Sequence, residues 1–126
     1  MAMARRGYLL VAMLFVAATV VQVFLGGLNV MSGGEEDIDP HRFLGFALML
    51  AAILLLVLAF LGQLSRTATM LSVGLLVLVV LQSLWVADDQ SSGLRAIHPT
   101  MALFIFGLGI DLMRRGLVSL RAPATA

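Results

Sequence analysis

The chain of 126 residues is 61% hydrophobic and only 12% charged, whereas an ordinary soluble domain is roughly 45–50% apolar and about 25% charged. The apolar residues fall in long blocks that a water-soluble fold of this size cannot bury, so the composition excludes a soluble domain. The lack of cysteine excludes disulfides, iron–sulfur clusters, thiolate zinc sites and Cys-x-x-Cys-His heme attachment in this chain, and the net charge of +1 gives no indication of nucleic-acid binding.

Four apolar stretches follow one another along the chain, and each reaches or nearly reaches the roughly 20 residues that a membrane-spanning helix needs. They are residues 8–31, 43–64, 68–87 and 96–113. The first follows two arginines, as a signal peptide would, but it is longer than the roughly 7–15 apolar residues of a signal sequence, so we expect a retained span. The short connections predict one all-α domain over residues 1–126, an integral membrane four-helix bundle in which successive helices run up and down.

The distribution of arginine predicts the orientation of the bundle, because cytoplasmic flanks collect Arg and Lys. Only Arg42 and Arg95 lie beside the first and third loops, where the acidic residues also gather. The six on the opposite side are Arg5, Arg6, Arg66, Arg114, Arg115 and Arg121. We therefore expect a multi-pass protein of the bacterial plasma membrane with both termini in the cytoplasm.

An internal repeat relates the two halves of the chain. Gln22 precedes His41 by 19 residues across the first outer loop, and Gln82 precedes His98 by 16 residues across the third. The repeat predicts two helical hairpins related by an approximate two-fold axis along the membrane normal. The two histidines, the only ones in the chain, then lie at one depth on diagonal helices, as bis-histidine ligation of a heme b requires.

Small and amide side chains accompany both histidines. Gly45 and Ala102 each follow a histidine by four residues and so share its helix face, where they would leave a flat slot for a porphyrin or allow close helix packing. Gln22 and Gln82 either line the inner edge of that pocket or hydrogen-bond between helices. We place all four residues in the candidate cofactor site.

Arg42 and Arg95 complete the candidate site, because each lies within three residues of a histidine and could pair with a heme propionate or anchor its helix at the interface. A zinc ion would need further ligands from the acidic loop. Copper could use methionine, but Met101 after His98 has no counterpart after His41. The symmetric arrangement favours heme.

The segment Gln22-Val23-Phe24-Leu25-Gly26-Gly27-Leu28, followed by a histidine that opens the next helix, resembles half of heme A synthase. Residues 8–115 as a whole resemble a small bacterial family of four-helix membrane proteins of unknown function, with His-Arg-x-Leu-Gly opening the second helix and Ile-His-Pro the fourth. The resemblance implies a b-type heme between His41 and His98 in the outer half of the bundle. It does not imply heme A synthesis, since that enzyme has eight helices and two histidine pairs.

One ligand pair on the outer side predicts a one-heme cytochrome that relays an electron there, or holds heme, within a larger respiratory or redox complex in the lipid bilayer. No catalytic residues are predicted. The alternative is a cofactor-free structural or accessory subunit of a membrane complex, which uses its apolar faces to pack against larger partners.

The orientation has a direct test. A reporter fused at Ala126 is expected in the cytoplasm and one inserted at Ser92 outside it, because six arginines lie on one side and two on the other. Paired reporters that are active in only one compartment measure this. A Ser92 reporter in the cytoplasm would contradict both the orientation and the common depth of the histidines.

Overall fold

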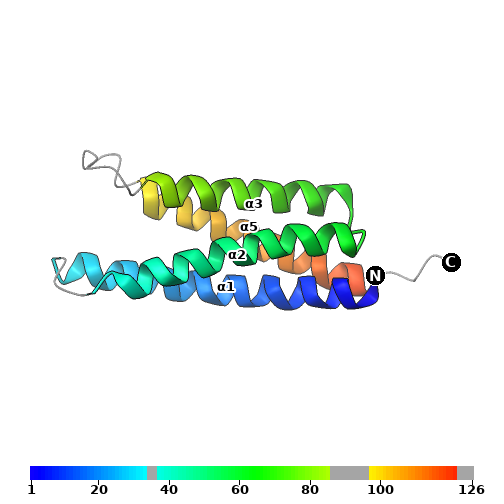
Figure 1. Ribbon diagram of the computed structural model, residues 1–126, viewed down its shortest axis with the longest axis horizontal. Helices are drawn as coiled ribbons and strands as arrows, with labels where there is room; N and C mark the ends of the chain where they lie inside the picture. Colours follow the sequence, from blue (N-terminus) through cyan, green and yellow to red (C-terminus); the bar gives the residue numbers. More distant parts are fainter. Residues whose placement is uncertain (34–36, 86–96, 122–126) are drawn as a thin grey trace.

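The computed structural model describes residues 1–33, 37–85 and 97–121. This part of the chain contains the helices α1 (Ala2–Met31), α2 (Asp39–Leu61), α3 (Arg66–Trp85) and α5 (Ile97–Arg121), shown in Figure 1. The all-α, four-helix prediction is confirmed. The largest differences from the predicted spans are at α1, which begins at Ala2, and at α5, which continues to Arg121.

Local sequence explains where the helices begin and end. Pro40 lies in the first turn of α2, where its missing N–H costs no hydrogen bond. Ser65 precedes α3, and its Oγ accepts a hydrogen bond from the Ala68 N–H at 3.2 Å, as an N-cap does. After α1, Gly33 adopts a left-handed conformation with φ of 69°, which glycine tolerates and which ends the helix.

Three helices are long and apolar enough to cross a membrane, namely α1, α2 and the segment Arg66–Leu84 of α3. This result indicates a membrane protein. The helix α5 is not among them, and its second half carries Asp111 and three arginines. The fourth predicted span therefore remains a prediction.

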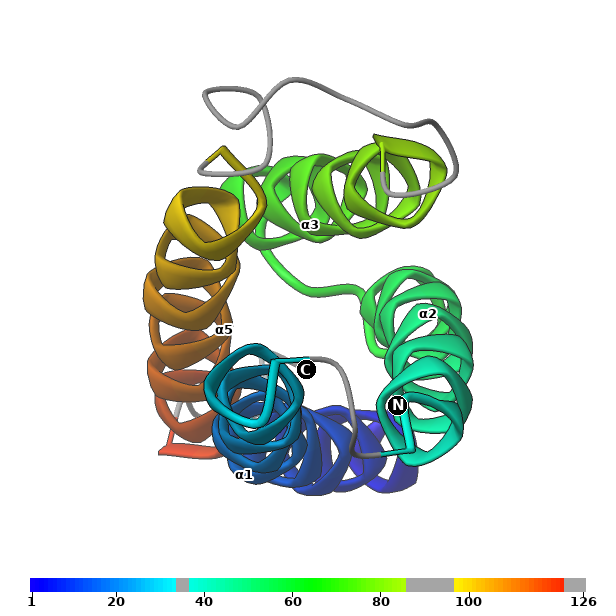
Figure 2. The ribbon, with the colours of Figure 1, turned by 90° about the vertical axis from the view of Figure 1, so that its left-hand side faces the viewer.

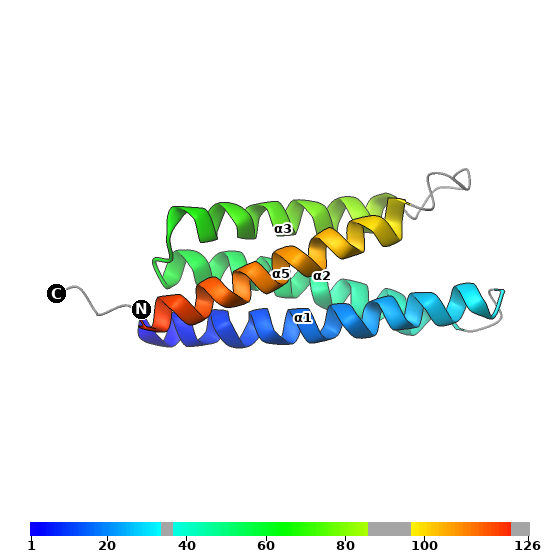
Figure 3. The same cartoon turned by 180° about the vertical axis from the view of Figure 1, so that it is seen from behind.

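The four helices pack around a common axis (Figure 2). Among the described residues, α1 contacts α2 and α5, and α3 also contacts α2 and α5, so α2 and α5 lie on a diagonal. Successive helices run in opposite directions along the long axis (Figure 1). As a result, α1 begins and α5 ends at one end of the molecule, whereas α2 and α5 begin at the other (Figure 3).

In every helix, four buried residues recur at intervals of four, three and four, and Thr69 on α3 is buried outside this series. This spacing is the heptad pattern of helices packed at a shallow angle. The sets are Tyr8, Ala12, Phe15 and Thr19 on α1; Leu48, Ala52, Leu55 and Ala59 on α2; Ala68, Ser72, Leu75 and Val79 on α3; and Ile105, Gly109, Leu112 and Gly116 on α5.

Glycine brings α5 close to α1. A Cβ at Gly116 would lie 3.1 Å from the Tyr8 ring and 3.3 Å from the Leu9 Cα, and one at Gly109 would lie 3.2 Å from the Phe15 ring. Small residues at such contacts allow the helix backbones to approach inside a membrane.

We predict that Gly116→Leu lowers the thermal unfolding midpoint of the detergent-solubilised protein, because overpacking a close contact typically costs about 1–3 kcal/mol. Gly107→Leu is the matched control on the same helix, since a Cβ there meets nothing within 4 Å. Circular dichroism against temperature measures both midpoints. Equal midpoints for the two variants would show that the α1–α5 contact is not tight.

Candidate cofactor site

The two histidines face each other near one end of the bundle. His41 lies in the first turn of α2 and His98 in the first turn of α5, so both lie at the end of the molecule where these helices begin. Their ring centroids are 6.1 Å apart and the ring planes make an angle of 52°. Since α2 and α5 are diagonal, the imidazoles approach each other across the bundle axis.

Two hydrogen bonds between α1 and α2 fix the position of His41. The Gln22 Nε2 donates to the His41 carbonyl oxygen at 2.9 Å, and the His41 Nδ1 lies 3.1 Å from the Gln22 carbonyl oxygen. A carbonyl oxygen only accepts, so the Nδ1 must carry the proton in this contact. In the neutral ring the Nε2 then keeps its lone pair, which is how a backbone carbonyl prepares a histidine to bind a metal.

Gly26 accommodates the His41 ring against α1. A Cβ at Gly26 would lie 3.1 Å from the His41 Cε1 and 3.3 Å from its Nδ1. Gly26 follows Gln22 by four residues and therefore shares its helix face. This spacing is the sequence signal for a site residue that the sequence analysis missed.

A cavity of about 320 Å³ lies around the two rings. Ligand pockets in proteins are typically about 300–1,000 Å³, so this one is at the small end of the range. Seven of the eight residues predicted for the cofactor site line it: Gln22, His41, Arg42, Gly45, Gln82, His98 and Ala102. The eighth, Arg95, lies outside the described residues.

Three buried polar atoms in the lining have no hydrogen-bond partner among the described residues. They are the Gln22 Oε1, the Gln82 Oε1 and the His98 Nδ1. An unsatisfied buried polar group costs about 1–3 kcal/mol, and native structures contain few of them. Because all three belong to residues that line one cavity, the cavity is suited to a ligand or to ordered water that would satisfy them.

Gly45, which lines the cavity, also leaves space for a side chain from α1. A Cβ there would lie 3.3 Å from the Gln22 Nε2, so this glycine makes room for the amide that reaches the His41 carbonyl. Arg42 pairs with Asp39 at 3.7 Å, but both side chains are more than two-thirds exposed. Such a pair is worth little, and the guanidinium remains available to another anion.

The described residues contain no cluster of three or more His, Asp or Glu side chains that could hold a metal ion. A zinc site built from the histidines and additional carboxylates therefore has no support in this part of the chain. Ligation of a heme, in contrast, would need only the two imidazoles and no carboxylate.

The fold and the cavity define a small all-α membrane protein whose two histidines converge between diagonal helices. The chain belongs to DUF6220, a family of unknown function, whose family model matches residues 22–88, more than half of the chain. The matched part includes Gln22, His41 and Gln82 and ends before His98. No curated protein and no solved structure matches the chain. None of these comparisons links it to heme A synthase.

The tautomer of His41 can be measured without any cofactor. With histidine labelled by ¹⁵N, nuclear magnetic resonance should show one ring protonated at Nδ1, because the Gln22 carbonyl accepts that proton. Gly26→Val should abolish this signal by displacing the ring. Gly27→Val, the matched control, should keep it, since nothing lies within 4 Å of a Cβ at Gly27. Identical spectra for both variants would contradict the proposed placement of the ring.

Proposed function

We propose that this protein binds one heme b between His41 and His98 and serves as a cytochrome-like electron relay, or as a heme-holding protein, within a larger redox complex of the membrane. The observation that carries the proposal is the 6.1 Å separation of the two imidazole centroids across the bundle axis. Two metal–nitrogen bonds of about 2 Å, each with about 1.1 Å more from nitrogen to ring centre, would separate axial imidazoles by about 6 Å.

The chemistry of the remaining donors supports this proposal. The proton on the His41 Nδ1 leaves its Nε2 as the free donor. His98 and Gln82 line the same cavity, and the His98 Nδ1 and the Gln82 Oε1 are both buried without a partner among the described residues, so the Gln82 oxygen is a candidate acceptor for this imidazole. Arg42 lies in the first turn of α2 and lines the cavity, where it could pair with a carboxylate of the cofactor.

A bound heme would supply reversible one-electron chemistry at its iron. The residues of this chain would hold and tune that group. His41 and His98 would provide the nitrogen ligands of the iron, and the Gln22 carbonyl would keep His41 in the ligating tautomer. Leu48, Val79 and Ile105, which line the cavity and are buried, would exclude water from it.

The proposed membrane arrangement has four spans, α5 being the fourth, in two repeated hairpins with both termini in the cytoplasm of a bacterial cell. The ion pair between the Arg115 Nε and the Asp111 Oδ2, at 2.8 Å, supports a membrane location for α5 because pairing lowers the cost of charge near lipid. The histidines then lie in the outer leaflet. A single outer site cannot by itself carry electrons across about 30 Å of hydrocarbon, which favours a partner complex.

The test compares heme spectra of the wild-type protein and histidine variants. The wild type should show the narrow reduced alpha band of a six-coordinate b heme, and both His41→Ala and His98→Ala should lose it, because each removes one axial nitrogen. The double variant should lose little more, since ligands that act as a unit are not additive. Ser83→Ala is the control, because this cavity residue donates its hydroxyl to the Val79 carbonyl of its own helix.

The alternative function is a cofactor-free structural or accessory subunit. Unchanged spectra in both histidine variants, with membrane insertion intact, would overturn axial ligation. Colourless wild-type protein from heme-sufficient cells would favour the alternative.

A further inference from the structure

A second cavity, of about 470 Å³, lies at the opposite end of the bundle from the histidines. Three arginines line it, namely Arg5 from α1 and Arg114 and Arg115 from α5. The only carboxylate among its lining residues is Asp111, so three positive charges face one negative charge. This excess of positive charge favours an anion.

Each arginine has a different role in the cavity. The Arg5 Nε donates to the Gly62 carbonyl at 2.9 Å and its NH1 to the Ser119 carbonyl at 3.1 Å. Arg5 thereby binds the C-terminal ends of α2 and α5, where free carbonyls concentrate negative charge. Because a guanidinium has five N–H groups, three remain for a ligand.

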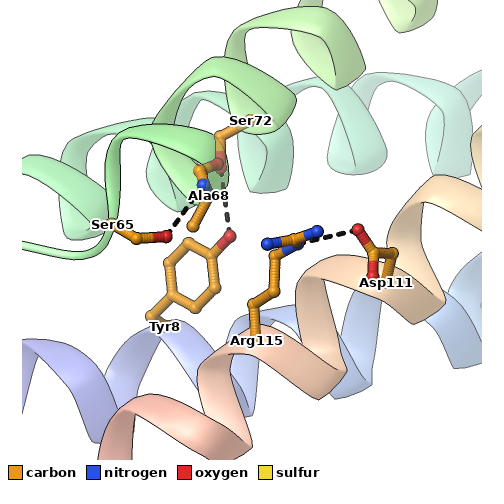
Figure 4. Close-up of polar contacts among 6 residues, drawn as sticks. All are labelled: Tyr8, Ser65, Ala68, Ser72, Asp111 and Arg115. Carbon is orange, nitrogen blue, oxygen red and sulfur yellow. Dashed lines mark hydrogen bonds and ion pairs between the residues drawn. The ribbon is translucent and has the colours of Figure 1, made fainter.

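Arg115 is committed to its own helix, whereas Arg114 is not. Figure 4 shows the Arg115 side chain turned toward Asp111, which it contacts at 2.8 Å. Arg114 and Arg115 follow Asp111 by three and four residues, and either spacing allows an ion pair on one helix face. The structure pairs only Arg115 with Asp111. Arg114 is exposed, and no hydrogen bond or ion pair joins it to the described residues, since Asp111 pairs with Arg115.

The N-terminus of α3 adds to the positive potential. Ser65 and Ala68, which open this helix, line the cavity. The Ser65 Oγ already accepts the Ala68 N–H, so this helix end contributes the positive end of its dipole rather than a free donor. Tyr8 does not compete for the ligand, because its hydroxyl lies 3.1 Å from the Ser72 Oγ, as Figure 4 shows.

We propose that this arginine cavity binds the phosphate of an anionic phospholipid. The cavity lies where α1 and α3 begin and α2 ends, and these are the three helices apolar enough to span a membrane. A lipid phosphate lies at that level of the bilayer, where basic pockets between helices bind anionic headgroups. Leu64 and the largely exposed Val118 line the cavity as well and would contact the acyl chains, which a free phosphate would not need.

The test is native mass spectrometry of the full chain released from micelles that contain equal amounts of phosphatidylglycerol and phosphatidylcholine. We expect preferential retention of phosphatidylglycerol. Arg114→Gln should weaken it about fivefold, because it removes a charged donor that lines the cavity itself. Asp111→Asn should strengthen it by removing the opposing charge and releasing Arg115.

Arg66→Gln is the matched control, because Arg66 opens α3 at the same end of the molecule but does not line the cavity. Retention should be unchanged in this variant, although it loses the same charge. Equal losses in Arg66→Gln and Arg114→Gln, or equal retention of the two lipids, would overturn the proposal. Displacement of the lipid by millimolar inorganic phosphate would identify the cavity as a site for free phosphate and would also overturn it.

Discussion

Polar groups inside an apolar helix bundle must find partners within the protein, and this requirement governs the structure. Thr19, Ser72 and Ser83 each donate their hydroxyl to the carbonyl four residues earlier in the same helix. The Ser72 proton is used in that way, so the Tyr8 hydroxyl donates to the Ser72 Oγ and joins α1 to α3. Against this background, the three unsatisfied atoms beside the histidines are exceptions concentrated in one cavity.

The heptad core and the cavities follow from the same packing. Regular burial at intervals of four and three residues holds the helices in a square, with α2 and α5 separated across its diagonal. The first turns of these two helices carry the histidines, whose long side chains reach across the axis. At the opposite end, Arg5 satisfies the carbonyls of two helix ends and leaves a basic cavity between them.

The sequence predicted the four helices and the convergence of most of the candidate site, because apolar length and the Gln–His repeat are local patterns. It did not predict the position of Gly26 against the His41 ring, the amide beside Gly45 or the two contacts of Arg5. These depend on how α1 crosses its neighbours, and a sequence pattern does not determine the depth and rotation of one helix against another. The sequence also gives opposite indications on whether α5 crosses the membrane, because its first half is apolar and its second half is charged.

The central claim is that His41 and His98 form one axial pair. Titration of the purified, cofactor-depleted protein with hemin, followed by the Soret absorbance, tests it most directly. One ligand pair predicts a sharp end point at one hemin per chain and a six-coordinate low-spin spectrum throughout the titration. A featureless rise without an end point, or a high-spin spectrum at saturation, would contradict the claim.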